Sequence, residues 1–279
     1  MWFILSALAG LLFTGESLFQ RHFLRKQKDA WAFSFFYSLV GTLVSLPFML
    51  AAPVVPTSVF PWLGALFVGL LIVGNNLFLF KAATTMEASL IGALFKLKFA
   101  WIFVLGIVLL GSAFEWSKLA GVVLTMGAGL IIMHRFRRPG SSSGIYLVLA
   151  ATVLNALLII VSKRLLDYFN PVSLTFFVSF LPALVLNFIC MPRARSRIKS
   201  MFSADWKVVF GMCVIGAAAN LILNVALSLN DATSVTIVSE VFLVLILAGE
   251  HLFLKEKEQL WVKLASIVLA VAGAIMIQL

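Results

Sequence analysis

Long apolar runs alternate with short polar turns along the whole chain. Each run is about 20 residues long, the length of helix that crosses the hydrocarbon core of a membrane. Prolines mark several of the turns between runs, as at Pro53, Pro139 and Pro192. The pattern therefore predicts an all-α, polytopic membrane protein. We expect about ten transmembrane helices, at residues 2–24, 31–51, 62–81, 88–110, 117–134, 145–166, 171–191, 206–228, 232–254 and 259–278.

The composition agrees with a helical membrane protein. Hydrophobic residues make up 62% of the chain and charged residues 11%, whereas a soluble domain carries about 25% charged residues. The apolar runs do not alternate in polarity, as the strands of a membrane barrel would. The net charge of +10 lies mainly in the turns, where helix insertion explains it, so no nucleic-acid partner is expected.

The turn RFRRPGSSSG at 135–144 divides the chain almost in half. We expect one five-helix repeat over residues 1–138 and a second over residues 139–279. Because five is an odd number, the second repeat is inverted relative to the first. Inverted repeats are typical of transporters, whose binding site lies near the membrane midplane where the repeats meet.

Short sequence matches between the two halves support this division. Glu87-Ala88-Ser89 corresponds to Asp231-Ala232-Thr233, an offset of 231 − 87 = 144. Asn76 corresponds to Asn220 at the same offset, 220 − 76 = 144. Glu87 and Asp231 precede apolar helices, and we expect both to act as helix N-caps.

Two lysines interrupt the fourth apolar run, LIGALFKLKFAW at 90–101. Lys96 lies roughly 12 Å into the predicted helix, at about 1.5 Å per residue. That depth falls in the middle third of a hydrocarbon core about 30 Å thick. Because a lysine at a helix centre costs about 2.5–3.5 kcal/mol on insertion, Lys96 and Lys98 require water or a counter-charge.

The repeat offset suggests a counter-charge for Lys96. Glu240 is its equivalent, since 240 − 96 = 144, and the two side chains are expected to pair if both face the pseudo-two-fold axis. Lys98 points about 200° away around the helix, so we expect a different partner for it, Glu16 in the first predicted helix. Intramembrane charges favour a role in substrate or proton handling. A salt bridge that only holds helices together is the open alternative.

Other candidates carry weaker signals. Asn76, Asn220 and Asn155 are amides inside predicted helices, where substrate contacts and helix–helix hydrogen bonds are both open. Aromatic residues near the start of the second and seventh predicted helices can wall a pocket, among them Tyr37. The chain shows no metal-ligand spacing, nucleotide-binding loop or nucleophile motif, so we expect no cofactor, metal or enzymatic activity.

Several motifs together resemble a known family. They are the basic ends of the first helix of each half, Gln20-Arg21 and Ser162-Lys163-Arg164, the acidic-Ala-Ser/Thr entries described above, and the glycine-bearing runs GVVLTMGAGLII at 121–132 and ASIVLAVAGAIMI at 265–277. With two five-helix halves, the chain resembles the drug/metabolite transporter superfamily, in its ten-helix EamA-like branch, over nearly its whole length. That branch often has a proline in the middle of the fourth and ninth helices, where this chain has Lys96 and Glu240. The resemblance implies small metabolite substrates, moved by exchange or with protons.

The sequence thus predicts a secondary active transporter that moves a small polar or zwitterionic, amino-acid-like metabolite by alternating access. A lysine and a glutamate match the carboxylate and ammonium of a zwitterion. Proton coupling and exchange both remain open, and the expected setting is the lipid of a bacterial inner membrane. The alternative is a lipid-handling flippase or scaffold with a structural ion pair. The distribution of basic residues places both termini outside, whereas the family resemblance implies that they lie inside.

Overall fold

All regular structure that the chain shows is helical. The computed structural model describes residues 1–27, 30–83, 86, 88–135, 142–180, 206–243, 268–269, 272–273 and 276, and no strand occurs among them. The helices with defined bounds are α1 (Trp2–Gln27), α2 (Ala30–Ala51), α3 (Val59–Ala83), α4 (Ala88–Phe95), α5 (Lys98–Leu110), α6 (Trp116–Arg135), α7 (Ser142–Leu165), α8 (Pro171–Val178), α11 (Trp206–Leu229) and α12 (Ala232–Leu243).

Four of the described helices contain a segment that is long and apolar enough to cross a membrane. These segments are Phe33–Ala51 in α2, Val59–Ala83 in α3, Gly144–Leu165 in α7 and Trp206–Leu229 in α11. Two shorter segments, Trp2–Ser17 in α1 and Lys98–Leu110 in α5, are also apolar. Many large hydrophobic side chains on these helices are exposed, for example Ile4 at 70% and Val59 at 71%. Apolar surface of this extent marks contact with a membrane. The predicted all-helical integral membrane protein is confirmed at this level, while most of the tenth predicted helix and parts of the seventh and ninth lie outside the described residues.

The predicted continuous helix over 88–110 is wrong, because α4 and α5 are separate. Leu97 N–H donates to the Leu94 carbonyl at 3.0 Å, and Phe99 N–H donates to the Lys96 carbonyl at 3.1 Å. These bonds span three residues instead of four and form a tighter turn. No proline marks the break, so the apolar pattern alone gave no sign of it. Such turns inside a helix often mark a functional hinge.

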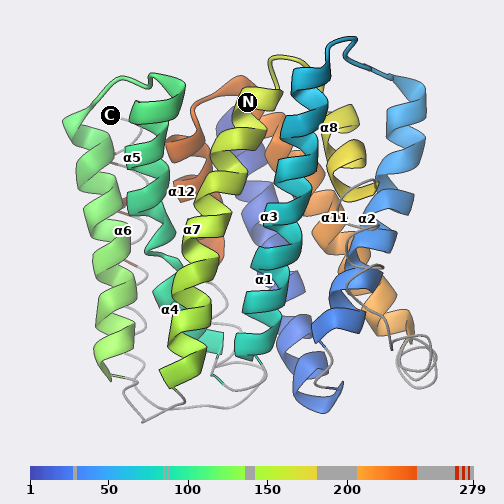
Figure 1. Cartoon of the computed structure of the whole chain (residues 1–279). Helices are drawn as coiled ribbons and strands as arrows, with labels where there is room; N and C mark the ends of the chain where they lie inside the picture. The colour runs from blue at the N-terminus through green and yellow to red at the C-terminus, as the bar shows by residue number, and fades with distance from the viewer. Residues whose placement is uncertain are drawn as a thin grey trace.

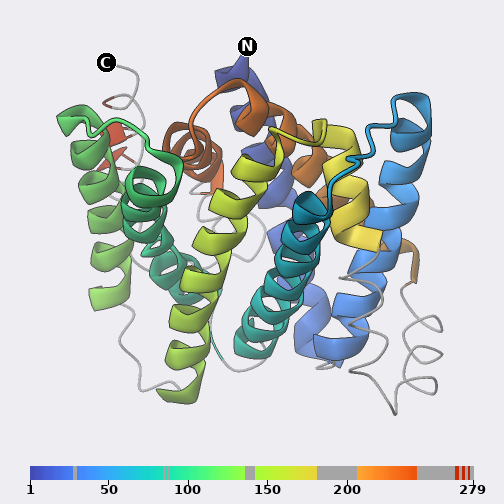
Figure 2. The same ribbon diagram turned by 45° about the horizontal axis from the view of Figure 1, so that its top comes forward.

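Two long helix pairs form the frame of the bundle. α1 packs along α11, and α3 packs along α7 (Figure 1). α12 packs on α1 and also on α5, which in turn packs on α7. The N-terminus lies at the same end of the bundle as the turns from α5 to α6 and from α11 to α12 (Figure 2). The broken helix α4–α5 therefore meets α12 inside this frame.

Small residues allow these helices to approach closely, as is common in membrane bundles. A Cβ atom at Gly10 of α1 would collide with the backbone carbonyl of Ser239 in α12. A Cβ atom at Gly216 of α11 would lie 2.6 Å from the carboxylate oxygen Oε2 of Glu16. Because a backbone atom cannot rotate away, glycine is required at position 10 if α1 and α12 are to keep this contact.

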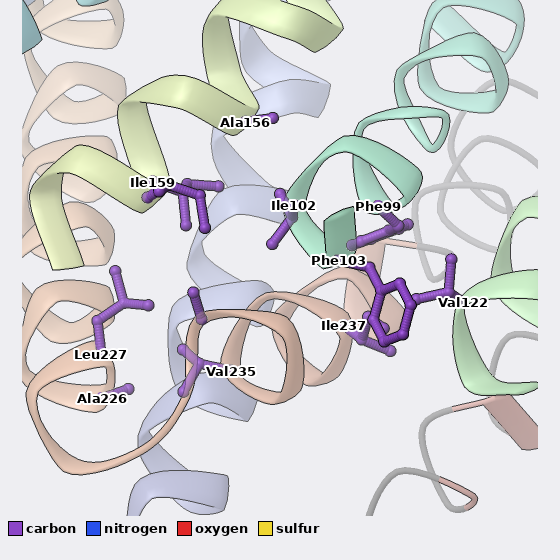
Figure 3. Packing of buried hydrophobic residues seen from close by; sticks show 12 residues of the cluster. Phe99, Ile102, Phe103, Val122, Ala156, Ile159, Ala226, Leu227, Val235 and Ile237 are labelled. Carbon is purple, nitrogen blue, oxygen red and sulfur yellow. The ribbon is translucent and has the colours of Figure 1, made fainter. Parts of the chain in front are cut away.

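An apolar cluster fills the space between α5, α6, α7, α11 and α12. Figure 3 shows Phe103 of α5 close to Ile237 of α12, while Ile102 of α5 lies toward Ala156 of α7. Ala156 and Ile159 of α7, Val122 of α6 and Leu227 of α11 belong to the same cluster. Its α5 residues lie between Lys98 and the helix end at Leu110, so the cluster closes that end of the α5–α12 contact.

Candidate functional site

A buried ion pair joins the start of α5 to α12. Lys98 Nζ lies 2.6 Å from Glu240 Oε1, and the side chains are 5% and 12% exposed. Lys98 is 110 − 98 = 12 residues from the end of α5, or about 18 Å at 1.5 Å per residue. This depth corresponds to the middle of a membrane core about 30 Å thick.

The two pairings predicted from the sequence are wrong. Glu240 bonds Lys98 and not Lys96, and Glu16 bonds Tyr37 and not Lys98. The repeat offset relates backbone positions, and the turn at 96–97 changes the direction in which each lysine side chain leaves the backbone. The prediction that a lysine of the fourth helix would meet Glu240 therefore identified the right helices but the wrong lysine.

Lys98 is surrounded by favourable partners. Besides the Glu240 carboxylate, its ammonium lies 4.3 Å from the ring centroid of Phe95 and 5.8 Å from that of Phe99. An ammonium within about 6 Å of a ring centroid is attracted by the electrons of the ring face. The charge of Lys98 is thus compensated on several sides.

Lys96 is equally buried but has no such partner. The residue is 6% exposed, and no described residue accepts a hydrogen bond from Lys96 Nζ. The charged groups that act on it through space are Glu240, which attracts, and Lys98, which repels. A buried polar group without a hydrogen bond is costly, and a buried charge is more so. Lys96 is therefore the least satisfied charged group in the described part of the bundle.

Three amide atoms of α3 and α7 are also buried without partners among the described residues. They are Asn75 Oδ1, Asn76 Nδ2 and Asn155 Oδ1. A Cβ atom at Gly74 would lie 3.0 Å from Leu154 Cδ1, so these asparagines sit at the same level of the α3–α7 contact. Asn155 adjoins Ala156, which belongs to the same apolar cluster as the α5 residues Phe99 and Ile102.

A second polar cluster lies where α1, α2 and α11 meet. The Tyr37 hydroxyl donates to the carboxylate of Glu16, which is 7% exposed. Asn220 Nδ2 donates to Tyr37 Oη at 3.2 Å and to the Gly216 carbonyl at 2.9 Å. Tyr37 was expected only to wall a pocket, and no motif of the chain indicated this hydrogen bond. No described residue forms an ion pair with Glu16.

Polar contacts also tie the helices together at the end nearest the N-terminus. Asp231 Oδ1 accepts from the backbone N–H groups of Thr233 and Ser234, each at 3.1 Å, which confirms Asp231 as the N-cap of α12. Lys118 Nζ of α6 lies 3.6 Å from Asp231 Oδ2. Lys163 of α7 donates to the backbone carbonyls that end α11. The other expected N-cap, Glu87, lies outside the described residues.

The seven residues singled out from the sequence thus fall into separate groups. Lys96, Lys98 and Glu240 lie together, Asn76 and Asn155 lie at the α3–α7 contact, and Glu16 and Asn220 share the Tyr37 cluster. Their functional roles stay predictions. Asn75, the neighbour of Asn76, carries the same weak signal in the sequence. Among the described residues, no group of His, Cys, Asp and Glu side chains is placed to hold a metal ion.

Comparisons with known proteins agree with this architecture. The model of the EamA-like transporter family matches residues 1–134 and, a second time, residues 142–279. A solved structure, described only as the crystal structure of a protein, is 17% identical in sequence, with a TM-score of 0.70. The similarity covers 98% of this chain and 96% of that one, and at this identity it shows a shared fold alone. A search of curated proteins finds no match.

Proposed function

We propose that this protein moves a small polar or zwitterionic, amino-acid-like metabolite. The chain belongs to the EamA-like transporter family and is thereby a membrane transporter of the drug/metabolite superfamily. Transport is secondary and proceeds by alternating access. The observation that carries this proposal is the group of Lys96, Lys98 and Glu240, buried where the broken helix α4–α5 meets α12. Charges inside a membrane bundle mark substrate or ion pathways.

The position of this group supports a binding site. Transporter sites lie near the membrane midplane and are commonly built from discontinuous helices. The break between α4 and α5 falls at Lys96 and Leu97, next to the ion pair. Glu240 is 240 − 232 = 8 residues into α12, or about 12 Å at 1.5 Å per residue. Both sides of the pair are therefore deep in the bundle.

Two five-helix repeats, over residues 1–138 and 139–279, supply the moving parts in this proposal. The family model matches the chain twice, near these bounds. The contacts between helices are consistent with the same two-fold relation between the repeats. Exchanging α1 with α7 and α3 with α11 turns the α1–α11 contact into the α7–α3 contact. Rocking of one repeat against the other would expose the midplane site to each side in turn.

The apolar cluster of Figure 3 fits the role of a closed gate. It joins α5 of the first proposed repeat to α12 of the second, on the side of the ion pair that leads to the N-terminal end of the bundle. Phe99, Phe103 and Ile237 are all buried in it. Opening that end requires these side chains to separate, which alternating access would accomplish by moving α12 away from α5.

Glu16 is the candidate for the coupling proton. Its carboxylate is buried at the α1–α11 contact, which joins the two proposed repeats, and its partner is the neutral Tyr37 hydroxyl. A buried carboxylate without a cation is readily neutralised by a proton. Exchange without a proton remains the alternative mechanism, and we place the protein in a bacterial inner membrane.

A lipid-handling flippase or scaffold is the second candidate. The observation that favours it is the complete set of partners around Lys98, which would suit a purely structural pair. In that case the ion pair holds α5 against α12 and no small solute crosses. Transport measurements on the intact protein separate the two candidates.

The test uses purified protein in liposomes, with uptake of labelled amino acids, amines and sugars measured in parallel with scrambling of a fluorescent lipid. We expect an amino acid to be taken up, and Glu240→Gln to reduce its uptake at least about tenfold. The matched control Lys207→Gln changes an exposed lysine at the start of α11 and should leave uptake unchanged. Lipid scrambling without solute uptake would support the second candidate instead.

A further inference from the structure

We propose that Lys96 binds an anionic group of the substrate, so that the transported solute carries a carboxylate. This inference rests on the proposed function and selects among its substrates. It excludes neutral sugars and organic cations, which a site defined only as polar or zwitterionic leaves open. It also assigns different roles to two lysines that the sequence places only two positions apart.

The charges of the site leave Lys96 uncompensated. Glu240 is held by Lys98 at 2.6 Å, so the three charged side chains together carry one net positive charge. Glu16, another buried acid among the described residues, hydrogen-bonds Tyr37 in the separate cluster between α1, α2 and α11. An ammonium buried this deeply is stabilised by an anion far more than it would be in water, since attraction between charges grows as the local dielectric falls.

Unpaired amides on the two helices that α4 packs against supply further groups for a bifunctional solute. Asn76 Nδ2 is a donor without a described partner and matches a second carboxylate oxygen. Asn155 Oδ1 is an acceptor without a described partner and matches an ammonium or a hydroxyl group. These side chains come from α3 and α7, and α4, which ends next to Lys96, packs on both. Amino acids and hydroxy acids share the required chemistry, a carboxylate with a nearby donor.

An unpaired buried lysine does not contribute to the stability of the fold, and this separates it from Lys98. Removing one member of a buried ion pair leaves the other charge uncompensated and destabilises strongly. Removing a charge that has no partner relieves an unfavourable burial. Lys96 therefore stands at a position where an apolar residue would stabilise the bundle, as expected for a residue whose partner arrives with the substrate.

The binding test uses the full-length protein in detergent and follows its melting temperature. The probes are the common amino acids, their carboxamides, which lack the carboxylate, and the corresponding hydroxy acids, with chloride and phosphate as separate arms. A ligand that binds the folded form raises the melting temperature by mass action. We expect a shift with an amino acid and with its hydroxy acid, none with its amide, and loss of the shift in both Lys96→Met and Lys96→Gln. The control Lys207→Met should keep it.

The second measurement needs no ligand. Without solute, Lys96→Met should melt about 3 °C higher than the wild type, whereas Lys98→Met should melt lower. Carboxamides that bind as well as the acids, or equal destabilisation by both lysine variants, would each overturn the role of Lys96. A shift with phosphate or chloride alone would overturn the assignment of a carboxylate to the solute. If a sugar or an amine is transported and Lys96→Gln leaves that transport unchanged, this inference fails while the proposed transporter stands. If no solute is transported at all, the proposed function fails as well.

Discussion

The α3–α7 contact and the α1–α11 contact are the two long helix pairs of the bundle, and their polar residues differ in one respect. At the α1–α11 contact, Glu16 and Asn220 both hydrogen-bond Tyr37. At the α3–α7 contact, Asn76 and Asn155 carry buried atoms that bond no described residue, and Lys96, also without a partner, follows the end of α4, which packs on both helices. The two helix pairs thus pack in a similar way. The acidic cluster of Glu16, Tyr37 and Asn220 is hydrogen-bonded, whereas Lys96 and the amides have no partner among the described residues.

This difference indicates where a bound solute would form the most new hydrogen bonds. Buried polar atoms are nearly always hydrogen-bonded in folded proteins, so unpaired ones require an explanation. A solute that bonds Lys96 and the amides gains interactions that the protein alone does not make. The cluster around Tyr37 offers few free bonding positions, which suits a site that takes up nothing larger than a proton. The comparison predicts that substitutions in the two regions have different consequences.

The largest effect is expected from the ion pair next to the unsatisfied region. Glu240→Leu leaves Lys98 buried without its counter-charge, so the free energy of unfolding should fall by about 3–5 kcal/mol. Thermal unfolding in detergent measures this change. The double variant Lys98→Met with Glu240→Leu removes both charges and should recover most of the stability. A double variant as unstable as the single one would show that packing around Glu240, and not its charge, is what α5 and α12 need.

A smaller effect is expected from filling the close contact in the acidic region. In Gly216→Ala the new Cβ atom would lie 2.5 Å from Tyr37 Oη and 2.6 Å from Glu16 Oε2, so both side chains must move. Overpacking of this kind costs about 1–3 kcal/mol of unfolding free energy.

The matched control for this substitution is Gly211→Ala in the same helix. Apart from the backbone of α11 itself, no atom of the described residues lies within 4 Å of a Cβ at Gly211, and the change from glycine should slightly stabilise α11. Equal melting temperatures for the two variants would contradict the contact between α11 and the Glu16–Tyr37 pair.

The apolar pattern was sufficient to predict most of the helices. α1, α2, α3, α6, α7 and α11 begin and end within a few residues of the predicted bounds, because each is a long apolar run between polar turns. The break at 96–97 was not predictable in this way. It has neither a proline nor a glycine, and a tight turn of two residues leaves the average hydropathy unchanged.

The charged residues of the candidate site were predictable, and their partners were not. Lys96, Lys98, Glu16 and Glu240 stand out because a membrane core tolerates few charges. The repeat offset indicated that the fourth and ninth helices meet, which the Lys98–Glu240 bond confirms. Which lysine reaches Glu240 depends on the local turn, and the Tyr37 bond to Glu16 depends on how α1, α2 and α11 cross. Neither is encoded in the spacing of residues along one helix.

The third substitution tests whether the acidic cluster depends on all of its hydrogen bonds. Tyr37→Phe removes the hydroxyl that donates to Glu16 and accepts from Asn220, while the ring keeps its contacts with Phe33 and Phe80. The loss of a hydrogen bond to a charged group should lower the free energy of unfolding by about 1.5–3 kcal/mol, and by about 1 kcal/mol if Glu16 is protonated. Unfolding measured at several pH values distinguishes these cases. If Tyr37→Phe leaves both stability and uptake unchanged while Glu16→Gln abolishes uptake, Glu16 acts without Tyr37. The α1–α11 region would then be less saturated than the hydrogen bonds suggest, and closer in character to the region around Lys96.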